Sequence, residues 1–402
     1  MSHTRAFTTV FNFMKNIILP LFLLSLLSSC STKEKELSKN FTDNYKLVIY
    51  DTLHIKSTGQ YLFPTSFIKE RIILTNLIGS DSIIQSDFKG NILNKFKVRG
   101  ESPETAGSNV FCMGYINDTT IGVIGNKGLF LYNLEGKLVS KFLKKNPSRL
   151  AGGIARMRRL VSFYESGEAN VLAHWIPFVD IDKLQELNSQ KSLYNQTKFL
   201  TLFNINKDKL SVEIPFEKNS IFVAEDKGYL EQHLFDYNKK NKRIYSLISP
   251  EKILRVYSQD GKKLEKSIEL NAKEFILRKV HPFGSPQSNE DINMLVNSEF
   301  RTLDISEDGN FTLISYQTGI PEEEYKKART QAEMPNIMRM FNKRYIILLE
   351  SDEQKSASIM LPKDVYEVVL FKSPEYILLA SNDFESPNYT SFYVARLEKV
   401  QK

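Results

Sequence analysis

Residues 82–96, SIIQSDFKGNILNKF, and residues 128–142, GLFLYNLEGKLVSKF, share one form, in which two short runs flank a turn that contains a glycine. Each first run is apolar or alternating, and an acidic or polar residue precedes Gly90 or Gly136. Such turns suit β-hairpins, because glycine accepts a positive φ without a steric penalty. Both stretches are therefore predicted to be hairpins of antiparallel strands.

The same form recurs at Ser258–Leu264 around Gly261 and at Ser306–Phe311 around Gly309, with a degenerate copy lacking glycine at Asn204–Leu210. Gly90 and Gly136 lie 46 residues apart, and Gly261 and Gly309 lie 48 apart. Four-stranded propeller blades typically repeat at about 40–50 residues. The spacing predicts one blade for each of these intervals, with two or three blades between Gly136 and Gly261.

Strand-like runs of four to eight residues, rich in Ile, Val, Phe and Tyr, continue from Tyr45 to the end of the chain. Helical periodicity is nearly absent, so the pattern indicates an all-β protein. The range 45–399 has room for six blades with long loops or seven tight ones. Two segments that break the pattern, 178–196 and 321–340, are expected to be short helical or loop insertions.

Residues 82–106 followed by 128–142 resemble the TolB-like six-bladed β-propeller lipoproteins of Bacteroidota, which run strand, D-x-x-G-k, strand, G-x-G-P-x-E. Gly100 and Pro103 match that pattern, whereas Ser102 replaces its second glycine and Thr105 its glutamate. A weaker similarity covers 245–317. The resemblance implies a β-propeller of six four-stranded antiparallel sheets in the cell envelope, and it adds little about activity.

The N-terminal segment is typical of a lipoprotein signal peptide. Ile17–Leu27 is too short to cross a bilayer, and Lys15 precedes it. Leu27-Ser28-Ser29-Cys30 then resembles a bacterial lipobox, which predicts removal of residues 1–29 and lipid attachment at Cys30. Residues 1–13 are interpreted as an extension from a start codon assigned too early, since Met14-Lys15 is a conventional beginning of a signal peptide. The alternative is a plain signal peptide with Cys30 unmodified.

Residues 30–44 are predicted to form the lipidated cysteine and a polar tether, followed by the propeller over 45–399. The charged residues after Cys30 resemble the export signal of surface lipoproteins in Bacteroidota. The expected location is therefore the outer membrane, with the cell surface favoured over the periplasmic face. The predicted partner is the membrane, through the N-terminal lipid.

The charge pattern does not indicate a nucleic-acid-binding protein, because a formal net charge of +7 is spread over 402 residues and is not clustered in a basic stripe. The densest basic run, 144–159, suits an anionic glycan or lipid headgroup, but a solvated edge strand and loop is the favoured interpretation. Cys112 would be the one thiol left after lipidation, in an apolar run that predicts a buried, inert side chain.

No catalytic, cofactor-binding or metal-ligating motif is recognised. The histidines, His3, His54, His174, His233 and His281, have no metal-ligand spacing. Trp175, next to His174, is the only tryptophan and would suit stacking on a sugar, with burial in the core as the alternative. His281 suits a strand-to-loop turn. His174, Trp175 and His281 are therefore the candidate ligand contacts.

Two classes of function remain. The favoured hypothesis is a monomeric, non-catalytic binding module that recognises a glycan, a peptide or an envelope partner without a cofactor. The alternative is a propeller enzyme, lactonase-like or glycan-cleaving, with carboxylates or histidines from several blades converging on the central channel. Fold analogy alone does not separate the two.

Overall fold

The computed structural model describes most of the chain after residue 44. The described ranges are 45–57, 62–76, 81–143, 158–165, 168–173, 198–207, 209–224, 232–249, 251–276, 298–327, 337, 340–381 and 388–400. Within these ranges, no helix has both the length and the apolar character needed to span a membrane.

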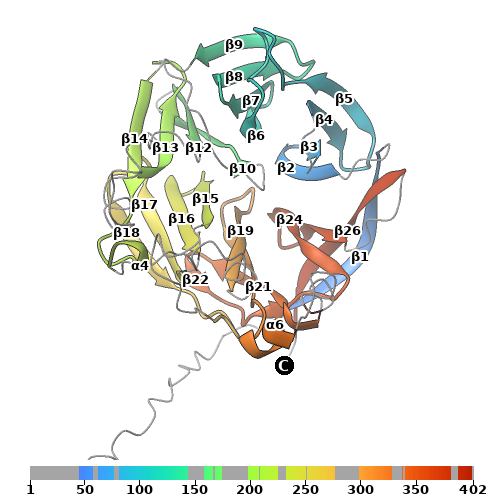
Figure 1. Ribbon diagram of the computed structural model, residues 1–402, viewed down its shortest axis with the longest axis vertical. Helices are drawn as coiled ribbons and strands as arrows, with labels where there is room; N and C mark the ends of the chain where they lie inside the picture. The colour runs from blue at the N-terminus through green and yellow to red at the C-terminus, as the bar shows by residue number, and fades with distance from the viewer. Residues whose placement is uncertain are drawn as a thin grey trace, which may run out of the picture. The chain divides into compact units, whose positions relative to one another are not determined.

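Six antiparallel sheets are arranged around a common axis as a six-bladed β-propeller (Figure 1). Blade 1 consists of β2 (Leu62–Ile68), β3 (Arg71–Asn76), β4 (Ser82–Asp87) and β5 (Ile92–Lys97). Blade 2 consists of β6 (Val110–Asn117), β7 (Thr120–Gly125), β8 (Gly128–Asn133) and β9 (Leu138–Leu143). Blade 3 consists of β11 (Val161–Glu165), β12 (Glu168–Ala173), β13 (Lys198–Asn204) and β14 (Lys209–Pro215).

The remaining blades follow in chain order, and in each blade the first of the strands named for it lies nearest the axis, apart from a two-residue strand that lies inside β6 in blade 2. Blade 4 consists of β15 (Gln232–Asn238), β16 (Arg243–Ser249), β17 (Ile253–Ser258) and β18 (Leu264–Glu269). Blade 5 consists of β19 (Glu299–Ile305), β20 (Phe311–Gln317), β21 (Arg344–Glu350) and two short outer strands, β22 (Glu353–Gln354) and β23 (Ile359–Met360). Blade 6 consists of β24 (Val365–Ser373), β25 (Tyr376–Ser381), β26 (Tyr389–Lys399) and β1 (Tyr45–Lys56).

Blade 6 closes the ring with strands from the two ends of the propeller. β1 is its outermost strand and pairs antiparallel with β26, from Tyr45 opposite Lys399 to Lys56 opposite Tyr389. An ion pair at 3.0 Å between Lys46 and Glu398 lies on this register. In the sequence, the run Ser391–Leu397 is too apolar to remain unpaired at a chain end, which predicts closure of the ring with the run Lys46–Leu53. The pairing of β1 with β26 confirms this prediction.

The long connections between strands all lie on one face of the ring, because neighbouring strands are antiparallel. Turns between first and second strands and between third and fourth strands share one side, the hairpin face, and none exceeds five residues. The longest intervals between strands, such as 270–298 and 318–343, begin and end at the opposite side, the loop face. Within the described ranges, the short helices α4 (Ile221–Ala224) and α6 (Glu322–Lys327) belong to loop-face intervals. The insertion expected over 321–340 thus begins with a short helix, whereas the segment 178–196 lies outside the described residues.

The four turn glycines adopt the same hairpin turn. Gly90, Gly136, Gly261 and Gly309 have φ of 88, 83, 71 and 70°, and the N–H of each donates to the carbonyl three residues earlier, at 2.8–3.2 Å. The predicted positive φ is confirmed at all four positions, and all four lie on the hairpin face.

One equivalence drawn from the sequence was wrong. Gly90, Gly136 and Gly261 lie between third and fourth strands, but Gly309 lies between the first and second strands of blade 5. The interval from Gly261 to Gly309 therefore joins two different hairpins and does not measure a blade. The equivalent turn of blade 5 is at Ser351-Asp352, where φ of 49 and 64° occurs without glycine. The degenerate copy at 204–210 is confirmed as the β13–β14 turn.

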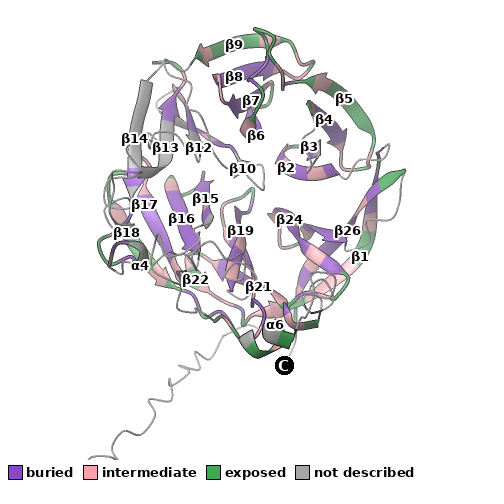
Figure 2. Cartoon of the chain, viewed as in Figure 1, coloured by how far each residue is buried: buried purple, intermediate pink, exposed green. Residues whose placement is uncertain are grey.

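Among the described residues, the hydrophobic core is divided into six clusters, each between two neighbouring blades. Figure 2 shows buried residues along the inner and middle strands and exposed ones along outer strands such as β5 and β9. Phe392 and Ala395 of β26 are fully buried, so the terminal strand is part of this core. Cys112 is also buried, as predicted.

A two-residue strand, β10 (Arg158–Arg159), lies beside β6 on its channel side and pairs with it in parallel. The basic run 144–159 was expected to be a solvated edge strand and its loop. Its described part, β10, is an edge strand, and it lies at the inner edge of blade 2. Sequence composition does not reveal which edge a two-residue strand joins.

Candidate functional site

A cavity of about 640 Å³ lies at the axis, on the side of the hairpin face. The innermost strands of five blades line it, with Phe67, Ile116, Ser162, Tyr237 and Ser306 as one representative from each. Its volume is within the range of about 300–1,000 Å³ typical of small-molecule sites.

Hydrogen bonds between blades fix the walls of this cavity. The Ser66 hydroxyl oxygen of blade 1 accepts from the N–H of Tyr115 in blade 2 at 3.3 Å. The Ser162 hydroxyl of blade 3 is 2.8 Å from the Ile116 carbonyl oxygen. These serines therefore position the inner strands of blades 1–3 relative to one another.

Backbone packing is close where blades 2 and 3 meet. The N–H of Leu160 donates to the Met113 carbonyl at 3.1 Å, so the segment entering β11 runs directly against β6. A Cβ atom on Gly114 would lie 2.5 Å from the Leu160 carbonyl oxygen. Glycine is required at 114 for this approach, which sets the position of the β11 wall.

Blades 3, 4 and 5 are joined by an aromatic pair and a carboxylate. Phe163 and Tyr237 stack with ring centroids 4.0 Å apart and an interplanar angle of 17°. The neighbouring Asp236 is buried, and its two carboxylate oxygens accept from the N–H groups of Tyr237 and Ile305, each at 2.8 Å. Asp236 is therefore engaged in fixing blade 5 to blade 4.

Tyr115 stays protonated at neutral pH. Burial raises the pKa of its hydroxyl well above the ordinary value, and the positive charge of Arg71 offsets only part of that effect. The hydroxyl of Tyr115, in blade 2, donates to Oε1 of Gln85, in blade 1, at 3.4 Å. Its side chain thus contributes shape rather than a titrating group.

Charged residues continue the inter-blade contacts on the hairpin face. Lys69 of blade 1 forms an ion pair with Asp118 of blade 2. Lys372 of blade 6 lies 3.7 Å from Glu70 of blade 1, and its carbonyl accepts from the N–H of Glu307 at 3.0 Å. The hairpins around the cavity mouth are therefore tied to their neighbours.

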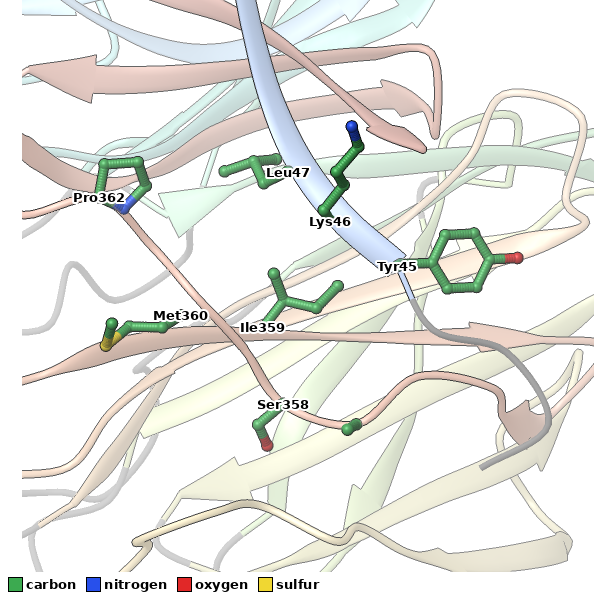
Figure 3. A pocket seen from close by; sticks show the side chains of 8 residues that line it. Tyr45, Lys46, Leu47, Ser358, Ile359, Met360 and Pro362 are labelled. Atoms are coloured by element: carbon green, nitrogen blue, oxygen red, sulfur yellow. The ribbon is translucent and has the colours of Figure 1, made fainter. Parts of the chain in front are cut away.

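A second cavity of about 380 Å³ lies on the outer wall, between blades 5 and 6. Figure 3 shows Tyr45 and Leu47 on β1 across from Ile359 and Met360 of blade 5. Only the outer strand β1 and the segment around β23 form it. The axial cavity, with walls from five blades, is the stronger candidate for a ligand site.

The residues predicted from sequence to contact a ligand, His174, Trp175 and His281, lie outside the described residues, as does Cys30. Of the remaining histidines, His54 Nδ1 is 2.8 Å from the Ser391 hydroxyl and His233 Nε2 is 2.7 Å from the Ser246 hydroxyl. Over the described ranges, no group of three or more His, Cys, Asp and Glu side chains is placed to hold a metal ion.

Comparison with solved structures supports the fold. The crystal structure of a member of the DUF4221 family from Bacteroides vulgatus is similar, with a TM-score of 0.62 and 14% sequence identity. The match covers 89% of this chain and 99% of that chain. No family model and no curated protein matches the sequence. At this identity the likeness concerns the fold alone.

Sequence reasoning missed the lysines at the cavity mouth. Lys239 and Lys242, in the turn between β15 and β16, both line the cavity and are exposed. The signal was present as the run KKNKR at 239–243, directly after an apolar strand. These lysines reach the cavity because their turn lies on the hairpin face, and sequence composition does not show on which face of the ring a turn lies.

Proposed function

We propose that this protein is a binding propeller of the cell envelope, with its ligand site in the axial cavity. The observation that carries the proposal is the convergence of five blades on one cavity of ligand size. Three polar groups of its wall, Ser66, Ser162 and Asp236, are engaged in inter-blade hydrogen bonds. A rigid, pre-formed site of this kind suits recognition of a glycan, a peptide or another envelope component.

A blocked cavity tests this proposal. Thr119 lines the mouth and is exposed, so Thr119→Trp should fill part of the cavity without disturbing the core. Panels of oligosaccharides, peptides and amphiphiles are screened by thermal shift and calorimetry against the purified protein. Binding should be lost in Thr119→Trp and retained in Ile92→Trp, a control on the outer strand β5. Ligands that bind both variants equally would place the site elsewhere.

Anchoring at the outer membrane is the second part of the proposal. The lipobox-like Leu27–Cys30 and the charged residues after it support a lipid at Cys30 and display at the cell surface. Together with the pattern at 82–142, they support grouping the chain with the TolB-like propeller lipoproteins of Bacteroidota.

Metabolic labelling tests the anchor. Radiolabelled palmitate should be incorporated by the wild type and not by Cys30→Ala, and labelling that persists in the variant would rule out Cys30 as the attachment site. Protease added to intact cells should degrade a surface-displayed protein. Full protection from protease would instead indicate the periplasmic face.

A further inference from the structure

The walls of the axial cavity offer apolar surface. Phe67 and Ile68 at the end of β2 are half-buried and line the cavity. The stacked pair Phe163 and Tyr237 forms part of the wall contributed by blades 3 and 4. Because the serine and aspartate groups between them already bond to the protein, the interior presents mainly carbon to a ligand.

Cationic charge is concentrated on one side of the mouth. Within the described part of the chain, the ammonium groups of Lys239 and Lys242 have no hydrogen-bond or ion-pair partner, whereas neighbouring Lys240 donates to Asn310 and Arg243 pairs with Glu265 at 2.6 Å. Unpaired cations beside an apolar cavity are available to an anionic group.

The backbone of this turn is well fixed. The Asn238 side-chain oxygen accepts from the N–H groups of Lys240 and Asn241 at 2.9 and 3.2 Å, and its amide donates to the Gly309 carbonyl at 2.8 Å. Lys242 has a φ of 57°, a left-handed conformation. The two lysines therefore extend from a turn held to blade 5.

One carboxylate opposes them. Glu307 lines the same mouth, is exposed, and forms no ion pair with the described residues. Asp118, the other exposed acid at the mouth, is neutralised by Lys69. At the mouth, the exposed side chains without an ion-pair partner thus carry two positive charges against one negative charge. The further carboxylate of the cavity, Asp236, is buried in the wall, where both of its oxygens accept from backbone N–H groups. The exposed charges at the mouth therefore favour an anion.

We propose that the axial cavity takes an amphipathic anion, with its apolar part against Phe67, Ile68 and Phe163 and its carboxylate or phosphate at Lys239 and Lys242. A lysine ammonium binds either anionic group as a point charge. This inference deepens the proposed function and rests on it, because both use the same cavity.

Calorimetric titration with matched probes tests the inference: decanoate, decyl phosphate, decanol and butyrate. Decanoate and decyl phosphate should bind the wild type about five- to tenfold more tightly than decanol, since two exposed charge contacts contribute modestly. Butyrate lacks the apolar part and should bind weakest. The ratio between decanoate and decyl phosphate separates a carboxylate from a phosphate ligand.

Variants identify the groups responsible. The double substitution Lys239→Gln and Lys242→Gln should reduce the affinity for both anions to that for decanol and leave decanol binding unchanged. Glu307→Gln should strengthen anion binding about two- to threefold, because it removes the opposing charge. Lys263→Gln, an exposed lysine outside the cavity, is the matched control and should behave as the wild type.

The outcomes separate this inference from the proposed function. Equal affinity for decanol and decanoate, or anion binding that survives the double lysine substitution, overturns the amphipathic anion while the cavity remains a site. If none of the probes binds, the inference is also overturned. The Thr119→Trp comparison then decides whether another class of ligand occupies the cavity.

Discussion

Gly90 and Gly261 adopt the same backbone conformation in equivalent hairpins, but their surroundings differ. A Cβ atom on Gly90 would lie 2.0 Å from the backbone oxygen of His54 in β1. On Gly261 the nearest atom would be a side-chain carbon of Ile214, at 3.3 Å. The first neighbour is backbone in a paired strand, whereas the second is a side chain able to shift.

Alanine should therefore have unequal effects at the two positions. Gly261→Ala should cost about 1 kcal/mol in the free energy of unfolding, from the left-handed φ. Gly90→Ala should cost about 3 kcal/mol or more, because β1 must move away. Urea denaturation measures both, with Ser351→Gly as the reverse control, which should stabilise the protein slightly because Ser351 already has positive φ. Equal losses at Gly90 and Gly261 would contradict the close contact with β1.

Arg255 is a buried cation in the middle of blade 4, with 2% of its side chain exposed. Its Nη1 lies 2.6 Å from Oε2 of Glu251, within ion-pair distance but outside hydrogen-bond geometry. Glu251 Oε1 accepts from the N–H of Ile221, the first residue of α4, at 2.7 Å. The pair thus joins β17 and the connection that precedes it to the helical turn α4, which lies before blade 4 in the chain.

A double-mutant cycle should show the dependence of each partner on the other. Arg255→Met alone should destabilise the protein by about 3–5 kcal/mol, because it leaves the Glu251 carboxylate buried and unpaired. Combining it with Glu251→Gln should recover part of that loss, since the amide oxygen still accepts from Ile221. Strictly additive losses in chemical denaturation would rule out the coupling.

At the scale of the element, polar side chains organise the glycine hairpins. Asp87 accepts from the N–H groups of Lys89 and Asn91 at 2.9 and 2.8 Å. Partial burial raises the pKa of Asp87, but the hydrogen bonds from Asn91 and Lys89 outweigh it and leave the pKa below its ordinary value. The pKa values of Asp260 and Asp308 are also lowered by hydrogen bonds within their turns.

These lowered pKa values predict loss of stability in acid. A carboxyl group with a depressed folded-state pKa stabilises the protein above the unfolded value of about 3.9, and this stabilisation is lost as the pH falls through the folded value. The urea midpoint should therefore fall between about pH 5 and pH 2. In the triple variant Asp87→Asn, Asp260→Asn and Asp308→Asn, the fall should be smaller. An unchanged pH dependence in that variant would show that other carboxyl groups dominate.

At the scale of the whole molecule, β26 connects the two ends of the ring. It pairs with β25 on one side and with β1 on the other, and Phe392, Ala395 and Leu397 are buried in the clusters beside blade 6. Without β26, β25 would be an unpaired edge and β1 would have no sheet to join.

Deletion of residues 389–402 should therefore give insoluble or loosely packed protein, measured by solubility and near-ultraviolet circular dichroism. Deletion of 400–402 leaves β26 intact and is the matched control, which should fold normally. Deletion of 31–42, which precede β1, should leave the thermal midpoint nearly unchanged. A 389–402 deletion as stable as the full chain would contradict the closed ring.

Much of the fold was predictable because its determinants are local. Alternating apolar runs specify strands, and a glycine three residues after Asp87 or Asn133 specifies a hairpin with positive φ. The terminal runs predicted closure, because strands as apolar as Ser391–Leu397 need a partner. Gly309 was placed in the wrong hairpin, since the same turn chemistry serves first and third turns alike. The turn at Ser351-Asp352 was missed because left-handed residues other than glycine leave no clear signal.

The sequence by itself determined the all-β class, the blade hairpins and the ring closure, since these follow from local backbone preference and apolar periodicity. Only the tertiary structure decided the axial cavity. Phe67, Ser162, Lys239 and Glu307 are far apart in the chain and resemble ordinary strand and turn residues. They meet because Phe67, Lys239 and Glu307 lie at or just beyond the hairpin-face ends of their innermost strands, and because the start of β11 places Ser162 against Ile116 of blade 2. That proximity is a property of the closed ring and of the close packing of β11 on Gly114.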